Sequence, residues 1–167
     1  DKISTVIDEI EASVTNYLGL KTLVSLSTGF LSYLVLLFIG IDAPIFWAFL
    51  ITLLNYIPTI GSLIATVFPA TYCLLQFGEL YPFVLVLILV GLIQIIIGNI
   101  LEPRLMGNSL NISSLATLIT LSIWGSIWGI TGMFLSVPIS VILIIILSQF
   151  PSTRPVAIML SDKGEIN

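Results

Sequence analysis

The residues of this sequence best placed to do chemistry are an acid and a base on either side of a proline. Glu102 and Arg104 flank Pro103, and they are the only charged residues between positions 80 and 153. Proline disfavours helical geometry in the residue before it, so we expect a helix to end near Leu101. We predict a gate or hinge here, in which flanking glycines permit close backbone approach, with an ordinary surface loop as the alternative. Its members are Gly98, Glu102, Pro103, Arg104 and Gly107.

A second stretch, NYIPTIG at residues 55–61, combines helix-breaking residues with polar side chains. Pro58 removes a backbone donor and Gly61 loosens the chain, so we expect this stretch to leave helical geometry. Inside a membrane, such backbone persists only where it is buried in protein or lines a watery cavity. The stretch is therefore predicted to lie on a substrate path, unless the proline only kinks a helix for packing. The residues of that path are Asn55, Tyr56, Pro58, Gly61, Gln94 and Asn99.

A third stretch, residues 124–138, places small residues at helical spacing. Glycines at such spacing let membrane helices approach closely. Gly125, Gly129 and Gly132 are therefore predicted to pack helices. Trp124 and Trp128 lie one turn apart and are predicted to be interfacial anchors or a pore-lining stack.

Residues for catalysis or metal binding are missing from the sequence. It has no histidine and one cysteine, and it lacks a glycine-rich phosphate loop and a nucleophile elbow. We therefore expect no enzymatic activity, no metal, no cofactor and no nucleic-acid partner. Asparagine, tyrosine, serine, threonine and glutamine remain, and these side chains can bond hydroxyl groups without a buried charge.

The composition indicates that membrane helices hold these residues. Hydrophobic residues make up 57% of the 167 positions and charged residues 8%, whereas soluble domains carry about 25% charged residues. The charge-free runs suffice for one, two, one and two helical spans of about 20 residues each. These runs are residues 22–41, 43–78, 80–101 and 105–153. The sequence thus predicts an all-α polytopic transmembrane bundle of about six membrane segments in the lipid bilayer.

The two ends of the chain differ from this bundle of residues 22–150. Residues 1–21 carry apolar side chains at three- and four-residue spacing, which predicts an amphipathic cytoplasmic helix. Its polar face is acidic, so we expect it to pack on protein, for example another subunit, rather than on an anionic lipid surface. Within the bundle, residues 43–78 are predicted to form either a broken or re-entrant hairpin or two short crossings. Residues 151–167 are predicted to be a cytoplasmic tail.

Lysine and arginine set the expected orientation, because cytoplasmic loops of membrane proteins are rich in these residues. If residues 43–78 enter and return on one side, all five basic residues fall on the cytoplasmic side. Asp42 and Glu79 then lie outside.

Together the three stretches resemble the autoinducer-2 exporter family, the PerM-like permeases of bacteria. The resemblance covers essentially the whole chain, and both order and spacing agree with the family pattern. The matching residues are Asn55, Tyr56, Ile57, Pro58, Ile60 and Gly61, then Gln94, Gly98, Asn99, Pro103, Arg104, Met106 and Gly107, and last Trp124, Gly125, Gly129, Gly132, Met133, Val137 and Pro138. Two positions depart from the pattern, since Ile97 and Ser114 stand where many members have glutamate and proline.

The resemblance also implies a setting for the chain. It implies a multi-pass protein of the bacterial inner membrane, with further membrane segments before residue 1. It implies a homo-oligomer, specifically a pentamer.

The activities that the resemblance implies are transport activities. The first is export of a small polar signal such as autoinducer-2. The alternative is exchange of sodium or lithium for protons, which normally needs a carboxylate within the membrane. Glu102 is the candidate for that carboxylate, and the glutamate replaced by Ile97 cannot serve. The third alternative belongs to a different functional class: a membrane assembly subunit that transports nothing.

Overall fold

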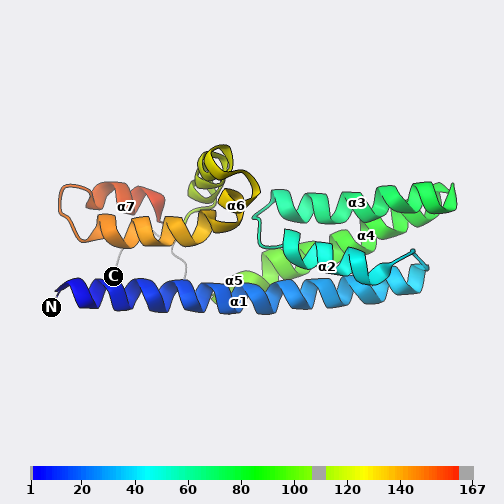
Figure 1. The fold of residues 1–167 in the computed structure, drawn as a ribbon, viewed down its shortest axis with the longest axis horizontal. Helices are drawn as coiled ribbons and strands as arrows, with labels where there is room; N and C mark the ends of the chain where they lie inside the picture. Colours follow the sequence, from blue (N-terminus) through cyan, green and yellow to red (C-terminus); the bar gives the residue numbers. More distant parts are fainter. Residues whose placement is uncertain (1, 107–111, 162–167) are drawn as a thin grey trace. The chain divides into compact units, whose positions relative to one another are not determined.

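The structure, a computed structural model, describes residues 2–106 and 112–161, and every regular element in these ranges is helical (Figure 1). The chain divides into two compact units, Lys21–Leu105 and Asp1–Leu20 with Met106–Asn167, which are described separately below. The elements are α1 (Lys2–Ile39), α2 (Pro44–Leu54), α3 (Ile60–Phe77), α4 (Leu80–Ile96), a π-helical segment (Ile97–Leu101), α5 (Glu102–Met106), α6 (Ser114–Ser148) and α7 (Arg154–Leu160). The predicted all-α class is confirmed.

Helix α1 joins two segments that the sequence predicted to be separate. The amphipathic helix and the first span were given a boundary near residue 21, yet one helix runs from Lys2 to Ile39. No proline interrupts it, and its two interior glycines, Gly19 and Gly29, are tolerated. The helix ends at Gly40, which has a φ of 84°, and the amides of Gly40 and Ile41 each donate to the Leu36 carbonyl at 3.1 Å.

In the Lys21–Leu105 unit, α2 and α3 form a hairpin around a break in the helix. Residues 55–59 are not helical, which confirms the predicted break, although Gly61 already belongs to α3. Thr59 turns the chain with a φ of 59°, and the Ile60 amide donates to the Pro58 carbonyl at 2.6 Å. Such a tight turn is strained for a β-branched residue. The fold therefore keeps Thr59 in an unfavourable backbone conformation.

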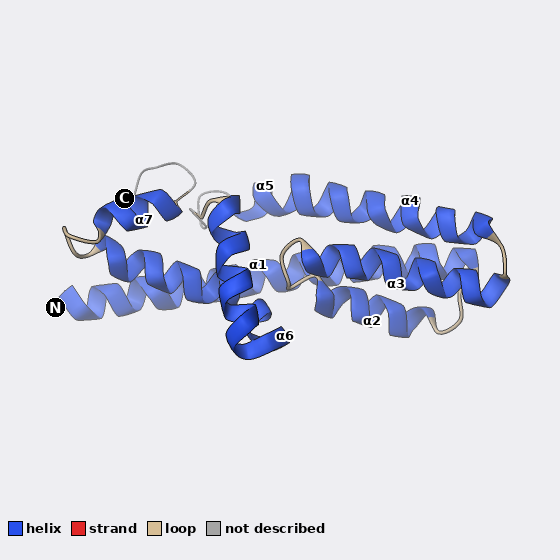
Figure 2. Ribbon diagram, turned by 90° about the horizontal axis from the view of Figure 1, so that it is seen from above, coloured by secondary structure: helices blue, strands red, loops and turns tan. Residues whose placement is uncertain are grey.

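The two ends of the hairpin lie at the same end of the unit (Figure 2). The Gln76 side chain near the end of α3 donates to the Gly40 carbonyl at 3.0 Å and accepts from the Asp42 amide at 2.8 Å. Helix α2 has 11 residues, or about 16 Å, which is too short for a hydrocarbon core of about 30 Å. Residues 43–78 therefore form a helical hairpin whose first arm is shorter than a membrane span.

The prediction that Pro103 ends a helix near Leu101 is wrong. The helix passes through the π-helical segment Ile97–Leu101 and continues as α5 to Met106, giving an apolar stretch of 27 residues from Leu80. The amide of Glu102 donates to the carbonyl of Ile97, five residues back. The wider π turn shifts the hydrogen-bond register, so Pro103 falls in the first turn of α5, where its missing N–H costs little.

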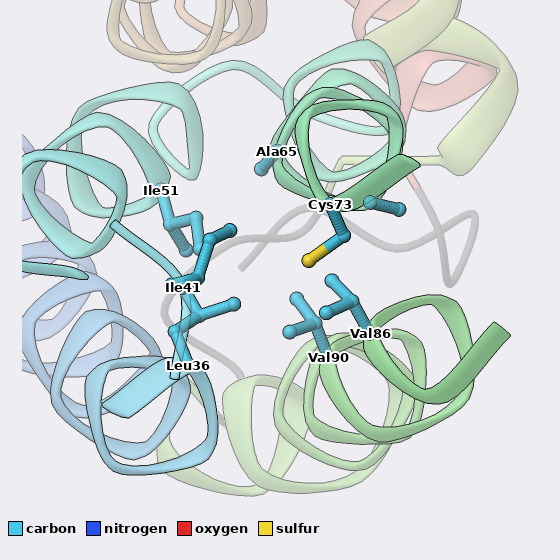
Figure 3. Packing of buried hydrophobic residues seen from close by; sticks show 8 residues of the cluster. Leu36, Ile41, Ile51, Ala65, Cys73, Val86 and Val90 are labelled. Atoms are coloured by element: carbon cyan, nitrogen blue, oxygen red, sulfur yellow. The ribbon is translucent and has the colours of Figure 1, made fainter. Parts of the chain in front are cut away.

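An apolar cluster fills the end of the unit where the hairpin begins and ends. It brings together side chains from α1, both arms of the hairpin, and α4 (Figure 3). Cys73 lies within it and is fully buried, as expected of an inert thiol. The members are Leu36, Ile41, Ile51, Ala65, Ala70, Cys73, Val86 and Val90.

The second unit contains the first half of α1 together with α6 and α7. Helix α6 is kinked at Gly129, which has a φ of 61° and a ψ of −138° that side-chain-bearing residues rarely adopt. Tyr17 of α1 packs in a cluster with Val137 and Val141 of α6, with Val6 and Ile10 at its edge. This face of the amino-terminal helix is thus covered by the same chain.

The described residues contain four helices long and apolar enough to cross a membrane, where the sequence predicted about six segments. Two differences account for the count. Helix α2 is too short to cross, and the two passes expected in residues 105–153 fall in α6, whose 35 residues count as one helix although the non-helical Gly129 divides them into two arms. The multi-pass character stands, with fewer long helices than expected.

Candidate functional site

A stripe of polar residues on α1 is buried inside the Lys21–Leu105 unit. Lys21, Ser25, Thr28 and Ser32 follow one another at spacings of four, three and four residues, so they share one helix face. None of the four is more than 4% exposed. Two further polar residues of the unit, one from the hairpin break and one from α4, are also buried. We call this set the polar seam, and its members are Lys21, Ser25, Thr28, Ser32, Asn55 and Gln94.

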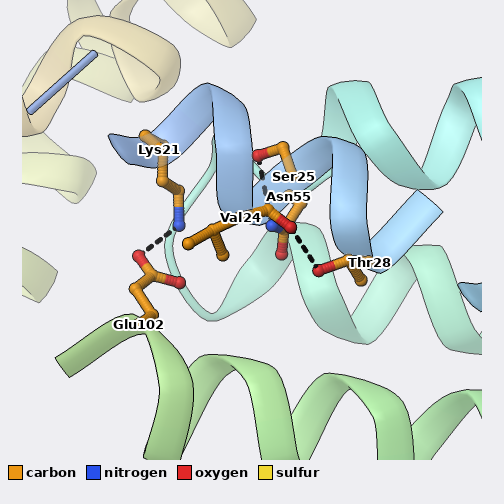
Figure 4. A network of polar contacts seen from close by, with 6 residues as sticks. All are labelled: Lys21, Val24, Ser25, Thr28, Asn55 and Glu102. Atoms are coloured by element: carbon orange, nitrogen blue, oxygen red, sulfur yellow. Dashed lines mark hydrogen bonds and ion pairs between the residues drawn. The ribbon is translucent and has the colours of Figure 1, made fainter. Parts of the chain in front are cut away.

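The hairpin break is held to α1 by two side-chain hydrogen bonds. Asn55, which is 7% exposed, donates from Nδ2 to the Ser25 hydroxyl at 3.2 Å (Figure 4). The Tyr56 hydroxyl donates to the Thr22 hydroxyl at 2.7 Å. Two of the four residues predicted from the NYIPTIG stretch, Asn55 and Tyr56, therefore contact α1, an element that the sequence did not assign to the site.

Glu102 is held to the same part of α1 by an ion pair. The Lys21 ammonium lies 2.5 Å from Glu102 Oε1, and the two side chains are 5% and 19% exposed (Figure 4). It is the one ion pair among the described residues. Removing one member of a buried pair is costly, because the other charge is left without compensation. Glu102 is thus partnered by a lysine 81 positions earlier in the chain, and not by Arg104.

These contacts bring the two predicted motifs to one place. Lys21, Thr22 and Ser25 lie within about one turn of α1, and they bind Glu102, Tyr56 and Asn55 respectively. The hairpin break and the start of α5 therefore meet at the same level of α1. Sequence reasoning missed this role of α1; the polar spacing from Lys21 to Ser32 in an apolar run was the signal that could have shown it.

Two members of the polar seam have side-chain atoms without a hydrogen-bond partner in the described part of the chain. These atoms are Ser32 Oγ and Gln94 Nε2, in residues that are 0% and 8% exposed. An unpaired buried polar group costs about 1–3 kcal/mol. The cost marks these atoms as places where a hydrogen-bonding ligand or water would stabilise the protein.

Several predicted site residues lie away from the seam. Gly98 and Asn99 are exposed in the π-helical segment, and Arg104 is exposed on α5. A Cβ at Gly98 would meet nothing within 4 Å, so the expected close backbone approach is absent there. Pro58 is partly buried in the turn of the hairpin. Gly107 lies outside the described residues.

Gly61 has a packing role. A Cβ on this residue would overlap the carbonyl of Leu54, so the start of α3 presses against the end of α2. Gly29 has a similar position, because a Cβ there would overlap the Thr52 hydroxyl and touch the Ala48 carbonyl. Glycine thus closes the hairpin on itself and against α1.

The three glycines predicted to pack helices have different roles around the kink of α6. A Cβ at Gly132 would overlap the Trp124 carbonyl, whereas one at Gly125 would meet the flexible end of Met133. Gly129 supplies the kink and has open space around it. The rings of Trp124 and Trp128 form a tilted pair with centroids 5.4 Å apart.

The described residues hold no group of histidine, cysteine, aspartate and glutamate side chains that could bind a metal ion. The chemistry of the site is therefore that of hydrogen bonds and one ion pair. It can bind and release polar groups, and it can join or separate helices.

Several known proteins are similar to this chain in sequence. The family model for the AI-2E family transporter matches residues 1–152. The chain is 41% identical over 150 residues to the AI-2 transport protein TqsA of Escherichia coli (strain K12), covering 90% of this chain and 43% of the relative. It is 45% identical over 127 residues to the putative transport protein YhhT of the same organism, covering 76% and 36%. A putative transport protein of Borreliella burgdorferi is 40% identical over 147 residues, covering 86% and 40%.

The fold and these similarities agree on one class of protein. The chain spans less than half the length of the relatives it matches, and the family match covers nearly all of it. Four helices of the described residues have the length and composition to cross a membrane. The chain is that of a multi-pass membrane protein, and it belongs to the AI-2E transporter family.

Proposed function

We propose that the protein moves a small polar solute across the bacterial inner membrane, and that the solute passes along the polar seam. The observation that carries this proposal is the burial of six polar residues inside an otherwise apolar unit. Burying a polar group in a membrane interior costs free energy. A common reason for such a group to be present is that it lines a transport path. A homo-oligomer is part of the proposal, following the family resemblance.

The contacts at the Lys21 end of the seam act as its gate. Lys21 binds Glu102, Thr22 binds Tyr56, and Ser25 binds Asn55. Opening this end requires α1 to separate from the hairpin break or from α5. A neutral hydrogen bond contributes about 1 kcal/mol, so a solute that replaces these bonds could shift the equilibrium between closed and open states. In this proposal the basic partner of Glu102 at the gate is Lys21, and not Arg104 of the predicted gate.

Autoinducer-2 is the first solute to test. The relative TqsA is named an AI-2 transport protein. A seam of hydroxyl and amide groups suits a neutral, hydroxyl-bearing signal, since each group can exchange its water for a solute hydroxyl.

Exchange of sodium or lithium for protons is the second candidate. Glu102 favours it, because it is a largely buried carboxylate, 19% exposed, near the end of a long apolar helix. A monovalent cation could compete with the Lys21 ammonium for Glu102. In that case the ion pair would be the coupling site and not only a gate.

Vesicles containing the full-length protein separate these functions. Release of autoinducer-2 is measured directly, and cation exchange is followed with a pH-sensitive dye after sodium is added. We expect protein-dependent release of autoinducer-2 and no pH change with sodium. A sodium-dependent pH change that Glu102→Gln abolishes would support the antiporter instead. Absence of both activities would favour the assembly subunit.

A further inference from the structure

We propose that Ser32 and Gln94 form a binding subsite for a neutral, hydroxyl-bearing solute, separate from the gate at Lys21. This inference rests on the proposed function in one respect, since it takes the polar seam as the solute path. It adds where along the path the solute binds and which side chains hold it. Ser32 was not among the residues that the sequence pointed to.

The subsite differs from the rest of the seam in its hydrogen bonding. Lys21 is paired with Glu102, Asn55 donates to Ser25, and the Thr28 hydroxyl donates at 2.9 Å to the carbonyl of Val24 (Figure 4). Ser32 Oγ and Gln94 Nε2 are the buried side-chain atoms of the described residues that have no such partner. The unmet hydrogen-bonding capacity is therefore concentrated at these two residues.

Two contacts fix how α1 and α4 run past each other. At one end, Lys21 of α1 pairs with Glu102, which follows α4 through the π-helical segment. At the other end, Leu36 of α1 and Val90 of α4 belong to the same apolar cluster (Figure 3). The two helices are thus antiparallel, with a polar level and an apolar level as reference points.

Both residues of the subsite lie between these levels. Ser32 precedes Leu36 by one helical turn, and Gln94 follows Val90 by one turn, so each lies on the Lys21 side of the apolar cluster. Ser32 shares the buried face of α1 that carries Leu36, and Gln94 shares the buried face of α4 that carries Val90. The two unpaired atoms therefore occupy the same depth of the unit.

The chemistry of the two side chains selects the ligand. Gln94 Nε2 is a donor and needs an acceptor oxygen, while the Ser32 hydroxyl can donate or accept. A solute hydroxyl can satisfy both. The ligand is neutral, because residues 22–41, 43–78 and 80–101 bring no charge to the subsite and Lys21 is already paired with Glu102. An ion placed there would lose its hydration without gaining a counter-charge.

Stability measurements distinguish a ligand site from a structural one. A side chain that is hydrogen-bonded in the folded protein lowers stability when it is replaced, whereas removal of an unpaired buried polar group leaves stability unchanged or raises it. Ser32→Ala and Gln94→Met keep most of the side-chain volume and remove the polar atoms. Ser27→Ala is the matched control, because the Ser27 hydroxyl lies on the same helix and is already bonded to the Leu23 carbonyl at 2.8 Å.

The experiment uses the full-length protein in detergent and in vesicles. Autoinducer-2 and glycerol serve as neutral probes, and lactate as the charged one. The thermal midpoint is recorded without probe and across probe concentrations, and release of the neutral probes is measured from vesicles. We expect the neutral probes to raise the midpoint of the wild type, and each subsite variant to need about tenfold more probe for the same rise. We expect Ser27→Ala to need the same probe concentration as the wild type for the same rise.

The outcomes separate this inference from the proposed function. If neutral probes raise the midpoint through Ser32 and Gln94 but are not released from vesicles, the subsite stands and transport fails. If the wild type releases them and both variants keep wild-type concentration dependence, transport stands and the subsite is wrong. A lower midpoint of both variants without probe, or a response to lactate alone, would also overturn the subsite. So would a wild type whose midpoint no neutral probe raises.

Discussion

At the scale of single residues, the surroundings of each glycine decide its role more than its place in a motif. Gly61 and Gly98 both belong to motifs that match the family, yet one presses against a carbonyl and the other faces open space. The difference arises because Gly61 follows a sharp reversal of the chain, while Gly98 lies on an exposed helical surface. The presence of a glycine in a motif therefore does not by itself show whether close packing requires it; the neighbouring atoms in the fold show that.

Gly61→Ala should destabilise the protein. The added methyl group would overlap the Leu54 carbonyl, and α2 and α3 could not keep their present approach. Overpacking of this kind costs about 1–3 kcal/mol. The measurement is the thermal midpoint of the full-length protein in detergent, with Gly98→Ala as the control in open space. Equal midpoints for the two variants would show that the hairpin does not close at Gly61.

At the scale of elements, α1 organises the site. One helix carries the apolar face that packs on α6, the polar stripe of the seam, and the groups that bind the hairpin break and α5. The π-helical segment contributes by letting a proline-containing stretch remain helical, so that Glu102 is carried on a helix rather than a loop. The gate is therefore a contact between helices.

The Lys21–Glu102 pair should show strong coupling between its two members. Glu102→Gln leaves a buried lysine unpaired and should lower stability by at least about 2 kcal/mol, whereas Lys21→Met leaves the more exposed glutamate and should cost less. The loss of stability in the double variant should be smaller than the sum of the losses in the two single variants. Thermal unfolding of the four proteins measures this, with the exposed Arg104→Met as control. Additive losses would mean that the two charges do not interact.

At the scale of the whole molecule, the proposed transport would require the seam to open and close, with the contacts at its Lys21 end holding the closed state. The hairpin is the part best suited to move, because its break is held to α1 by side-chain bonds at Asn55 and Tyr56. Its other end is tied by Gln76 to the end of α1. A motion about that tied end would separate the break from Ser25 and Thr22.

A covalent bond between α1 and the break should stop this motion. We expect Ser25→Cys with Asn55→Cys, in a Cys73→Ala background, to lose solute release on oxidation and to regain it on reduction. Asn55 Nδ2 donates to Ser25 Oγ at 3.2 Å, so the two positions face each other across the contact that the cross-link is meant to hold. Either cysteine alone is the control. Full release from vesicles whose protein is quantitatively cross-linked would rule out this gate.

The sequence by itself determined the class of protein, the helical character and the break in the hairpin. The apolar composition and the charge-free runs reflect the lipid that surrounds the helices, and Pro58 acts on its own backbone. Neither signal depends on residues far away in the sequence. The two motifs were also recognisable, because their breaks and polar groups are local. The end of a helix at Pro103 was the local inference that failed, since the π-helical segment just before it, Ile97–Leu101, changed the hydrogen-bond register.

Only the tertiary structure decided which residues meet. Lys21 and Glu102 are 81 positions apart, and Ser25 and Asn55 are 30 apart, so no local pattern could pair them. The same is true of the unpaired Ser32 and Gln94, because whether a polar atom has a partner depends on the helix packed against it. A hydrogen bond needs two groups within about 3 Å, and for helices brought together by the fold that distance is set by packing rather than by sequence separation.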